Sequence, residues 1–367
     1  MLRLAKIIIL LGFIMLFIGV VAGGFLFIVS GGEPIDYVRT AVLRWQLAGR
    51  EDELAQPASS DISEQIFEIP LGTAPFTIAN NLQMSGLITD AELFVLYAQV
   101  EGYDREFEAG TYFLSPSLTI PQIAQMLTDS SNSAITFRVV EGWRIEEIAD
   151  AIDQNPRFSF TGNDFLALVG RGAQFDQEIA NMLGIPNGSS LEGFMFPDTY
   201  VLSANVTASE LVNTLVSEFV SRTGEQMRLD AGADGYTMYD IVTIASIVER
   251  ESVWNDENVL IASVYRNRLD IDMLLQADPT VQYGLDNSRG RYWANITVAD
   301  YQGVNSPYNT YIYSGLPPGP IANPSLSAIR ASVYPASSNY IFFRARCDGS
   351  NRHNFAVTFD EHLANAC

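Results

Sequence analysis

Apolar residues recur every three to four positions along residues 241–251, which predicts a helix with one apolar side. Ile244, Ile247 and Val248 lie on that side, and at roughly 100° per residue Glu251 falls between the two isoleucines. A carboxyl group in an apolar stripe resists ionisation, so its pKa should be raised. Glu251 is therefore a candidate general acid. The alternative is a structural Glu at a helix end, paired with a nearby Arg.

The distribution of apolar residues and of turn-forming residues predicts further short helices and strands on either side of this helix. Strands are expected at residues 65–69, 110–114, 340–343 and 354–357, and helices at 78–82, 91–100, 208–222, 258–269 and 325–333. Residues 273–283 are typical of a loop around Pro279. This mixture predicts an α+β protein.

The chain begins with a hydrophobic segment. Residues 7–29 are uncharged, and as a helix these 23 residues would be about 34 Å long, which matches the apolar thickness of a bilayer. We therefore expect residues 1–30 to hold a short cytoplasmic N-terminus and one transmembrane helix. Basic residues precede the run and acidic residues follow it, so residues 31–367 should lie outside the cytoplasm. A cleaved signal peptide is the less fitting alternative, because the apolar run is long.

Beyond this anchor the patterns suggest four parts. These are a juxtamembrane linker at 31–65, a small α+β unit at 66–133, a second one at 134–190, and a mixed α/β domain at 191–367. The strand–helix–helix–strand order of the first unit resembles a LysM-like module, and LysM modules bind N-acetylglucosamine polymers. A packing domain without a ligand site is the alternative.

The charge of the chain excludes one class of partner. The sequence carries 43 acidic and 21 basic residues, a net charge of −22, whereas nucleic-acid binding requires a cationic surface. An anionic ligand could not be held by charge alone either. Recognition should depend on hydrogen bonds and aromatic faces, which the 16 tyrosines can supply.

Cysteine and histidine usage is sparse. Outside the cytoplasm Cys347 and Cys367 could form one disulfide, although their spacing alone leaves this open. His353 and His362 are nine positions apart with no HExxH motif, so we expect neither a metal site nor another cofactor.

Several motifs follow one another after residue 190. They are LEGFMFPDTY (191–200), IASIVERES (244–252), NRL (267–269), MLLQADPTVQY (273–283), SPYNTY (306–311), GLPPGPIANP (315–324) and RHNF (352–355). In this order they closely resemble the endolytic murein transglycosylases, the MltG or YceG-like family, over nearly the whole chain past the linker. The ordered set is far more specific than any one motif.

The resemblance implies an activity. The family cleaves the MurNAc–GlcNAc bond of peptidoglycan without water and leaves a 1,6-anhydro-MurNAc end. Its catalytic residue is the second Glu of an IVE(K/R)E(T/S) motif, which is Glu251 here, followed by Ser252. One carboxyl group can suffice, because it protonates the leaving oxygen and then takes a proton from the C6 hydroxyl of the substrate, an intramolecular nucleophile.

The motifs also supply candidates for binding acetamido groups and stacking on sugar faces. These are Gln276, Asp278, Tyr283, Tyr308, Asn309, Tyr311, Asn323, Glu192 and His353. Asn309 could instead satisfy the backbone of its own turn.

The resulting expectation is a single-pass membrane enzyme that cuts nascent glycan strands outside the cytoplasm, with 191–367 as its catalytic domain. Its partners would be peptidoglycan strands and the cell membrane, with peptidoglycan synthases and division proteins as further candidates. Two alternatives stay open. One is a hydrolase that uses Asp278 or Asp198 as a second carboxylate, and the other is a non-catalytic glycan-binding scaffold of the division machinery.

Overall fold

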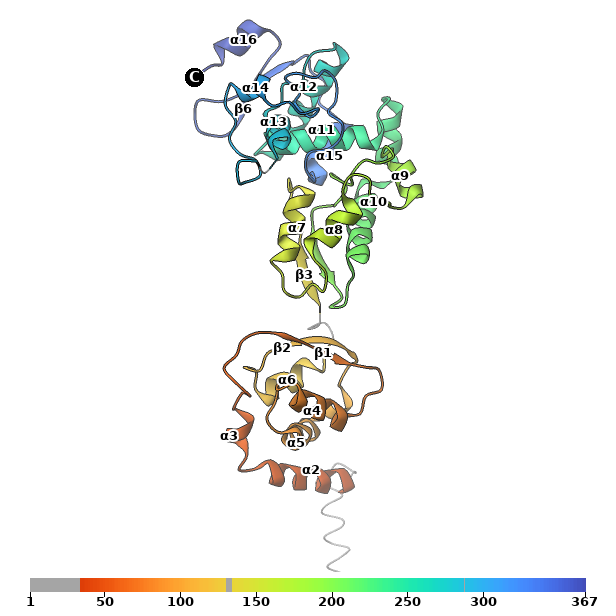
Figure 1. The fold of residues 1–367 in the computed structure, drawn as a ribbon, viewed down its shortest axis with the longest axis vertical. Coiled ribbons are helices and arrows are strands. Elements are labelled where there is room, and N and C mark those ends of the chain that lie inside the picture. Colours follow the sequence, from red (N-terminus) through yellow and green to blue (C-terminus); the bar gives the residue numbers. More distant parts are fainter. Residues whose placement is uncertain (1–33, 130–133, 287) are drawn as a thin grey trace, which may run out of the picture. The chain divides into compact units, whose positions relative to one another are not determined.

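The computed structural model describes residues 34–129, 134–286 and 288–367. The predicted membrane anchor at residues 7–29 lies outside these ranges. Within them, no helix is both long enough and apolar enough to cross a bilayer. The chain divides between Ala134 and Ile135 into two compact units (Figure 1).

The first unit is built on a two-stranded antiparallel sheet. Its elements are α2 (Pro34–Leu47), α3 (Glu51–Leu54), β1 (Gln65–Ile69), α4 (Pro75–Met84), α5 (Ala91–Glu101), the 3₁₀ turn η1 (Tyr103–Arg105), β2 (Gly110–Leu114) and α6 (Ile120–Met126). Phe67 of β1 pairs with Tyr112 of β2, and both are buried with Phe94 of α5 in one core. The strand–helix–helix–strand order agrees with the sequence pattern, whereas LysM-like character stays a prediction.

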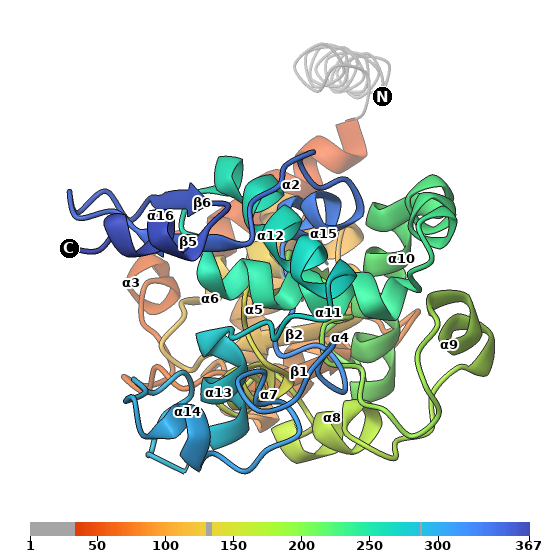
Figure 2. The ribbon, with the colours of Figure 1, turned by 90° about the horizontal axis from the view of Figure 1, so that it is seen from above.

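The second unit is mainly helical. Its elements are β3 (Ile135–Arg138), α7 (Ile145–Asp153), α8 (Gly162–Val169), α9 (Gln177–Leu183), β4 (Thr199–Leu202), α10 (Ala208–Ala233), α11 (Met238–Glu251), η3 (Asn255–Glu257), α12 (Asn258–Asp270), α13 (Asp278–Leu285), α14 (Asp300–Gly303), α15 (Leu326–Val333), β5 (Phe342–Ala345), β6 (His353–Ala356) and α16 (Phe359–Ala364). Helix α11 runs through its middle, with α10, α12 and α15 packed against it (Figure 2).

The strands of the second unit join segments that are distant in sequence. β3 pairs with β4 in an antiparallel register, so the segment before residue 190 and the segment after it share one sheet. The structure therefore has one compact unit over Ile135–Cys367 where the sequence pattern suggests two parts. At the C-terminal end, β5 pairs with β6, and a disulfide joins Cys347 to Cys367.

The largest differences from the sequence-based expectation concern α10 and α13. Helix α10 continues past residue 222 to Ala233, with a break at Gly224, where φ is 62° and ψ is 169°. Residues 278–285 form α13 rather than the predicted loop. That prediction was wrong because Pro279 stands in the first turn of the helix, where the missing N–H has no intrahelical partner to lose.

Candidate active site

Helix α11 carries Glu251 at its last position. Thr237 caps the other end by accepting a hydrogen bond from the backbone N–H of Asp240, and the apolar side chains between the two ends are fully buried. Ser252 then leaves the helix in an extended conformation. The chain therefore holds Glu251 at the point where a rigid, buried helix emerges, and the Glu251 side chain keeps part of its surface open to solvent.

Burial raises the pKa of Glu251 to about 7 from its ordinary 4.5. The hydroxyl of Tyr265 donates to Glu251 Oε1 over 2.9 Å, which favours the ionised form and partly opposes this rise in pKa. The negative charge of Asp278 raises the pKa further, and the positive charge of Arg268 lowers it. At neutral pH a large fraction of Glu251 is therefore protonated, as the apolar stripe of the sequence predicts.

The alternative of a structural Glu paired with an Arg does not describe this geometry. The neighbouring Arg250 lies with its guanidinium 3.9 Å from the ring centre of Trp293. The hydrogen bond to Glu251 comes instead from Tyr265, which is 1% exposed on α12. Glu249 has the structural role on α11, since its Oε2 accepts the N–H and hydroxyl of Ser325, at the start of α15.

Asp278 belongs to the same group of side chains. Tyr311 donates its hydroxyl to Asp278 Oδ1 over 2.6 Å, and the ring of Tyr301 stacks on that of Tyr311 at 4.2 Å between centres. Asp278, Tyr301 and Tyr311 are all partly exposed. Glu251, Asp278 and the two tyrosines therefore present two carboxyl groups and aromatic faces that a sugar could reach.

Backbone contacts fix the position of Asp278. The backbone N–H groups of Gln276 and Ala277 donate to the carbonyl and hydroxyl oxygens of Thr310, over 3.1 and 3.0 Å. Gln276 has a φ of +49°, which is unusual for a residue other than glycine, and its side chain is exposed. Such backbone strain often accompanies a functional position. Gln276 thus remains a candidate for substrate binding.

Three of the predicted binding residues are instead fully buried in the protein's own hydrogen-bond network. Asn309 donates to the carbonyls of Tyr301 and Val304 and has 0% exposure, so it satisfies its own turn. Asn323 and Glu192 also have 0% exposure. The structure does not support direct contact of these three side chains with a substrate.

Asn323 and Glu192 connect several loops. Asn323 accepts the N–H of Met195 and donates to the carbonyl of Trp143 and to Glu192 Oε1. Glu192 also accepts the backbone N–H of Ile145, and burial raises its pKa well above the ordinary value. Together they hold the 191–200 and 315–324 motifs against the start of α7, which is a scaffolding function.

Tyr283 and Tyr308 form a second aromatic pair, with their ring centres 4.6 Å apart. Arg144 lies over Tyr283 at 4.2 Å, and Arg171 donates to the hydroxyl of Tyr308 over 2.9 Å. These contacts are with arginines rather than with Glu251. Tyr308 is buried, with 7% of its surface exposed, whereas Tyr283 is partly exposed. Of the two, only Tyr283 thus remains a candidate for contact with a glycan.

His353 lies behind the site and is 8% exposed. Its Nδ1 is 2.9 Å from Glu257 Oε2. Its ring packs perpendicular to that of Phe343, and the ring of Phe343 packs perpendicular to that of Tyr265. His353 thus supports Tyr265 through packing. In the part of the chain that the structure describes, no cluster of His, Cys, Asp and Glu is suited to a metal ion.

Tyr265, Arg268 and Tyr301 were not predicted from the sequence. Arg268 donates to the carbonyls of Ile341 and Leu275, and burial lowers its pKa. Tyr265 precedes Arg268 by three positions, so the two share one face of α12. The NRL motif contains Arg268 and gives the only sequence signal for this face.

Comparison with known proteins places the chain in a family. Residues 67–367 match the model of the family described as YceG-like. The chain belongs to the YceG-like family. The family predicted from the ordered motifs is thereby confirmed.

Relatives in the YceG-like family carry informative names. The endolytic murein transglycosylase of Bacillus subtilis is 29% identical over 319 residues, covering 84% of this chain and 86% of that protein. The endolytic murein transglycosylase of Streptococcus pneumoniae R6 is 30% identical over 302 residues, and the match spans 53% of its length. A crystal structure of a YceG-like protein from Listeria monocytogenes is 30% identical, with a TM-score of 0.54 over 82% of this chain and 99% of that one.

Proposed function

We propose that this member of the YceG-like family is a lytic transglycosylase that cleaves peptidoglycan. Two relatives that match most of the chain are named endolytic murein transglycosylases. The observation that carries the mechanism is Glu251, a partly exposed carboxyl group with a pKa of about 7 at the end of a buried helix. A group of this kind can both give and take a proton at neutral pH.

In the proposed reaction, protonated Glu251 donates its proton to the oxygen of the MurNAc–GlcNAc bond as that bond breaks. The Glu251 carboxylate then takes the proton of the MurNAc C6 hydroxyl, whose oxygen bonds to C1 of the same sugar. No water is consumed, and Glu251 ends protonated and ready for another cycle. Because Tyr265 occupies Oε1, the catalytic proton would be carried on Oε2.

Asp278 supports hydrolysis as a second candidate function. Its charge reaches Glu251, and its Oδ1 accepts a hydrogen bond from Tyr311. Asp198 is less suited as the second carboxylate, because it pairs with Arg222 and is not among the groups that shift the pKa of Glu251. In the transglycosylase reaction, Asp278 would stabilise the positive charge that develops on the sugar.

The product distinguishes the two reactions. Mass spectrometry of a digest of purified glycan strands should show new MurNAc ends in the 1,6-anhydro form, lighter by one water than the reducing ends that hydrolysis leaves. In ¹⁸O-labelled water these ends should carry no label. Labelled, hydrated ends would instead establish a hydrolase, and an absence of any cleavage would favour a glycan-binding scaffold.

Tyr265→Phe should move the alkaline limit of activity upward. The wild-type rate is expected to fall as pH rises through about 7, because the proton donor is lost as Glu251 ionises. The Tyr265 hydroxyl stabilises the ionised form, so its removal should raise the pKa of Glu251 and shift this limit to higher pH. Tyr239→Phe is a matched control, since this buried tyrosine on α11 donates instead to the carbonyl of Pro318. Equal pH profiles for the Tyr265→Phe variant and wild type would contradict the assignment.

The proposed location is the cell membrane, with residues 7–29 as a single transmembrane helix and the enzyme outside the cytoplasm. The uncharged apolar run supports this location. Nascent glycan strands would then be the substrate, the first unit a LysM-like glycan contact, and peptidoglycan synthases or division proteins the partners. Protease treatment of spheroplasts tests the topology, since degradation of the domain that follows residue 30 is expected only on the outer side.

A further inference from the structure

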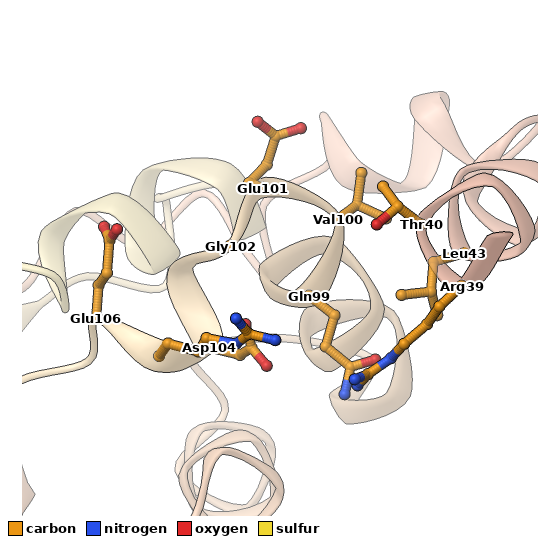
Figure 3. A pocket seen from close by; sticks show the side chains of 10 residues that line it. Arg39, Thr40, Leu43, Gln99, Val100, Glu101, Gly102, Asp104 and Glu106 are labelled. Atoms are coloured by element: carbon orange, nitrogen blue, oxygen red, sulfur yellow. The ribbon is translucent and has the colours of Figure 1, made fainter. Parts of the chain in front are cut away.

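Helix α2 has one side packed on the first unit. It lies against α5, and Leu47 contacts the core of the unit. Thr40 and Leu43 face a cleft between α2 and the end of α5 (Figure 3). This side accounts for the attachment of α2 to the rest of the unit.

The opposite side of α2 is apolar and uncovered in the part of the chain that the structure describes. Val38, Val42 and Trp45 follow the i, i+4, i+7 spacing of one helix face, and their exposed fractions are 46%, 48% and 77%. Arg44 is also exposed and lies beside this stripe, about 100° around the helix from Trp45. We call Val38, Val42 and Trp45 the outer face of α2.

The sequence before α2 limits what this face can meet. The apolar run ends at Val29, and five residue steps separate it from Pro34. Even fully extended, these steps reach only about 18 Å. Gly31 and Gly32 lie in this connection and permit a sharp change of chain direction. If residues 7–29 span a bilayer, α2 must start at the membrane surface.

We propose that the outer face of α2 inserts into the lipid interface of the membrane. This proposal rests on the proposed transmembrane anchor. Valine and tryptophan side chains suit the boundary between acyl chains and headgroups, where Trp45 can bury its ring and keep its N–H in a polar layer. Arg44 can extend to a lipid phosphate beside this face. The first unit is then held against the membrane by a surface as well as by a tether.

The cleft behind α2 is a weaker candidate for a lipid headgroup. Its volume is about 390 Å³, and three carboxylates line it together with two arginines: Glu101, Asp104 and Glu106 with Arg39 and Arg105. This lining has no excess of positive charge, so it does not favour a phosphate. The apolar outer face therefore carries the membrane contact.

Quenching of tryptophan fluorescence tests the proposal. The full chain is reconstituted in phosphatidylcholine–phosphatidylglycerol vesicles with or without brominated acyl chains, and flotation of the vesicles reports the anchor separately. Bromolipids should quench a part of the emission that Trp45→Phe removes, while aqueous acrylamide should quench that part weakly. The other tryptophans, Trp143, Trp254 and Trp293, belong to the second unit and form the background.

A charged variant supplies the matched comparison. Val38→Glu with Val42→Glu should reduce the lipid-quenched part by about twofold or more. Leu71→Glu, at a 94% exposed position of the same unit, should leave it unchanged. Two results would overturn the α2 proposal and leave the anchor intact, provided that wild type floats with the vesicles. In the first, acrylamide alone quenches Trp45, and in the second neither quencher does, because protein covers the ring. A chain that does not float overturns both, and glycan cleavage by that chain would still be measurable.

Discussion

Glu251→Gln is expected to lower the rate of glycan cleavage by about 10²–10⁴-fold. Glutamine keeps the size of the side chain and can still accept the hydrogen bond that Tyr265 donates to Oε1. It can neither protonate the leaving oxygen nor take a proton from the C6 hydroxyl. Because one group serves both steps of the proposed reaction, no other residue should restore the activity. The release of anhydro ends from purified strands measures this rate.

Glu249→Gln is the matched control for this loss. Glu249 lies two positions earlier on α11, and its Oε2 accepts two hydrogen bonds from Ser325. The glutamine oxygen can accept the same bonds, so activity should stay within a few-fold of wild type. Equal losses in both variants would show that general damage to α11, rather than loss of a proton donor, explains the result.

Glu251→Gln should also make the folded state more stable than that of wild type above neutral pH. The folded state raises the pKa of Glu251 from 4.5 to about 7, so ionised Glu251 disfavours folding. Wild type should be most stable, as far as this group is concerned, below pH 4.5 and lose roughly 3 kcal/mol as pH rises through 7. Glu251→Gln should lack this loss. Urea unfolding of both proteins at pH 5 and pH 8 measures the difference.

Local patterns predicted the elements that depend on neighbouring residues. The strands predicted at residues 65–69 and 110–114 are β1 and β2, and both have these bounds in the structure. The helical period placed Glu251 in an apolar stripe, and burial does raise its pKa. Both results follow because a few adjacent side chains decide which face of an element is buried.

Contacts between distant segments could not be read from those patterns. Tyr311 and Asp278 are 33 positions apart, and only the fold brings the two side chains together. Motif membership also could not tell exposed polar side chains from polar side chains that are buried in the fold. Asn323 and Glu192 have the polar side chains expected of a binding site, but both are fully buried in the fold. Their hydrogen bonds join segments that are far apart in sequence.

Gly193→Ala is expected to cause the largest loss of stability among the substitutions considered. Gly193 has a φ of +89°, a conformation that costs a residue with a side chain roughly 1–2 kcal/mol. A Cβ atom there would lie 2.6 Å from side-chain atoms of both Pro320 and Val242. Relieving these clashes should cost about 1–3 kcal/mol more, because Val242 is buried on α11. Thermal unfolding should show a melting temperature lower by roughly 5–15 °C.

Gly188→Ala separates the two causes of this loss. Gly188 has a similar φ of +80°, but an added Cβ would meet nothing within 4 Å. Gly188→Ala should therefore show only the backbone cost, with a melting temperature between those of wild type and Gly193→Ala. Gly193 also lies where the 191–200 motif meets Pro320 and α11, so its substitution should displace the helix that ends at Glu251. Per folded molecule, we expect the Gly193→Ala variant to cleave glycan more slowly than the Gly188→Ala variant. Equal rates would show that α11 keeps its position despite the clash.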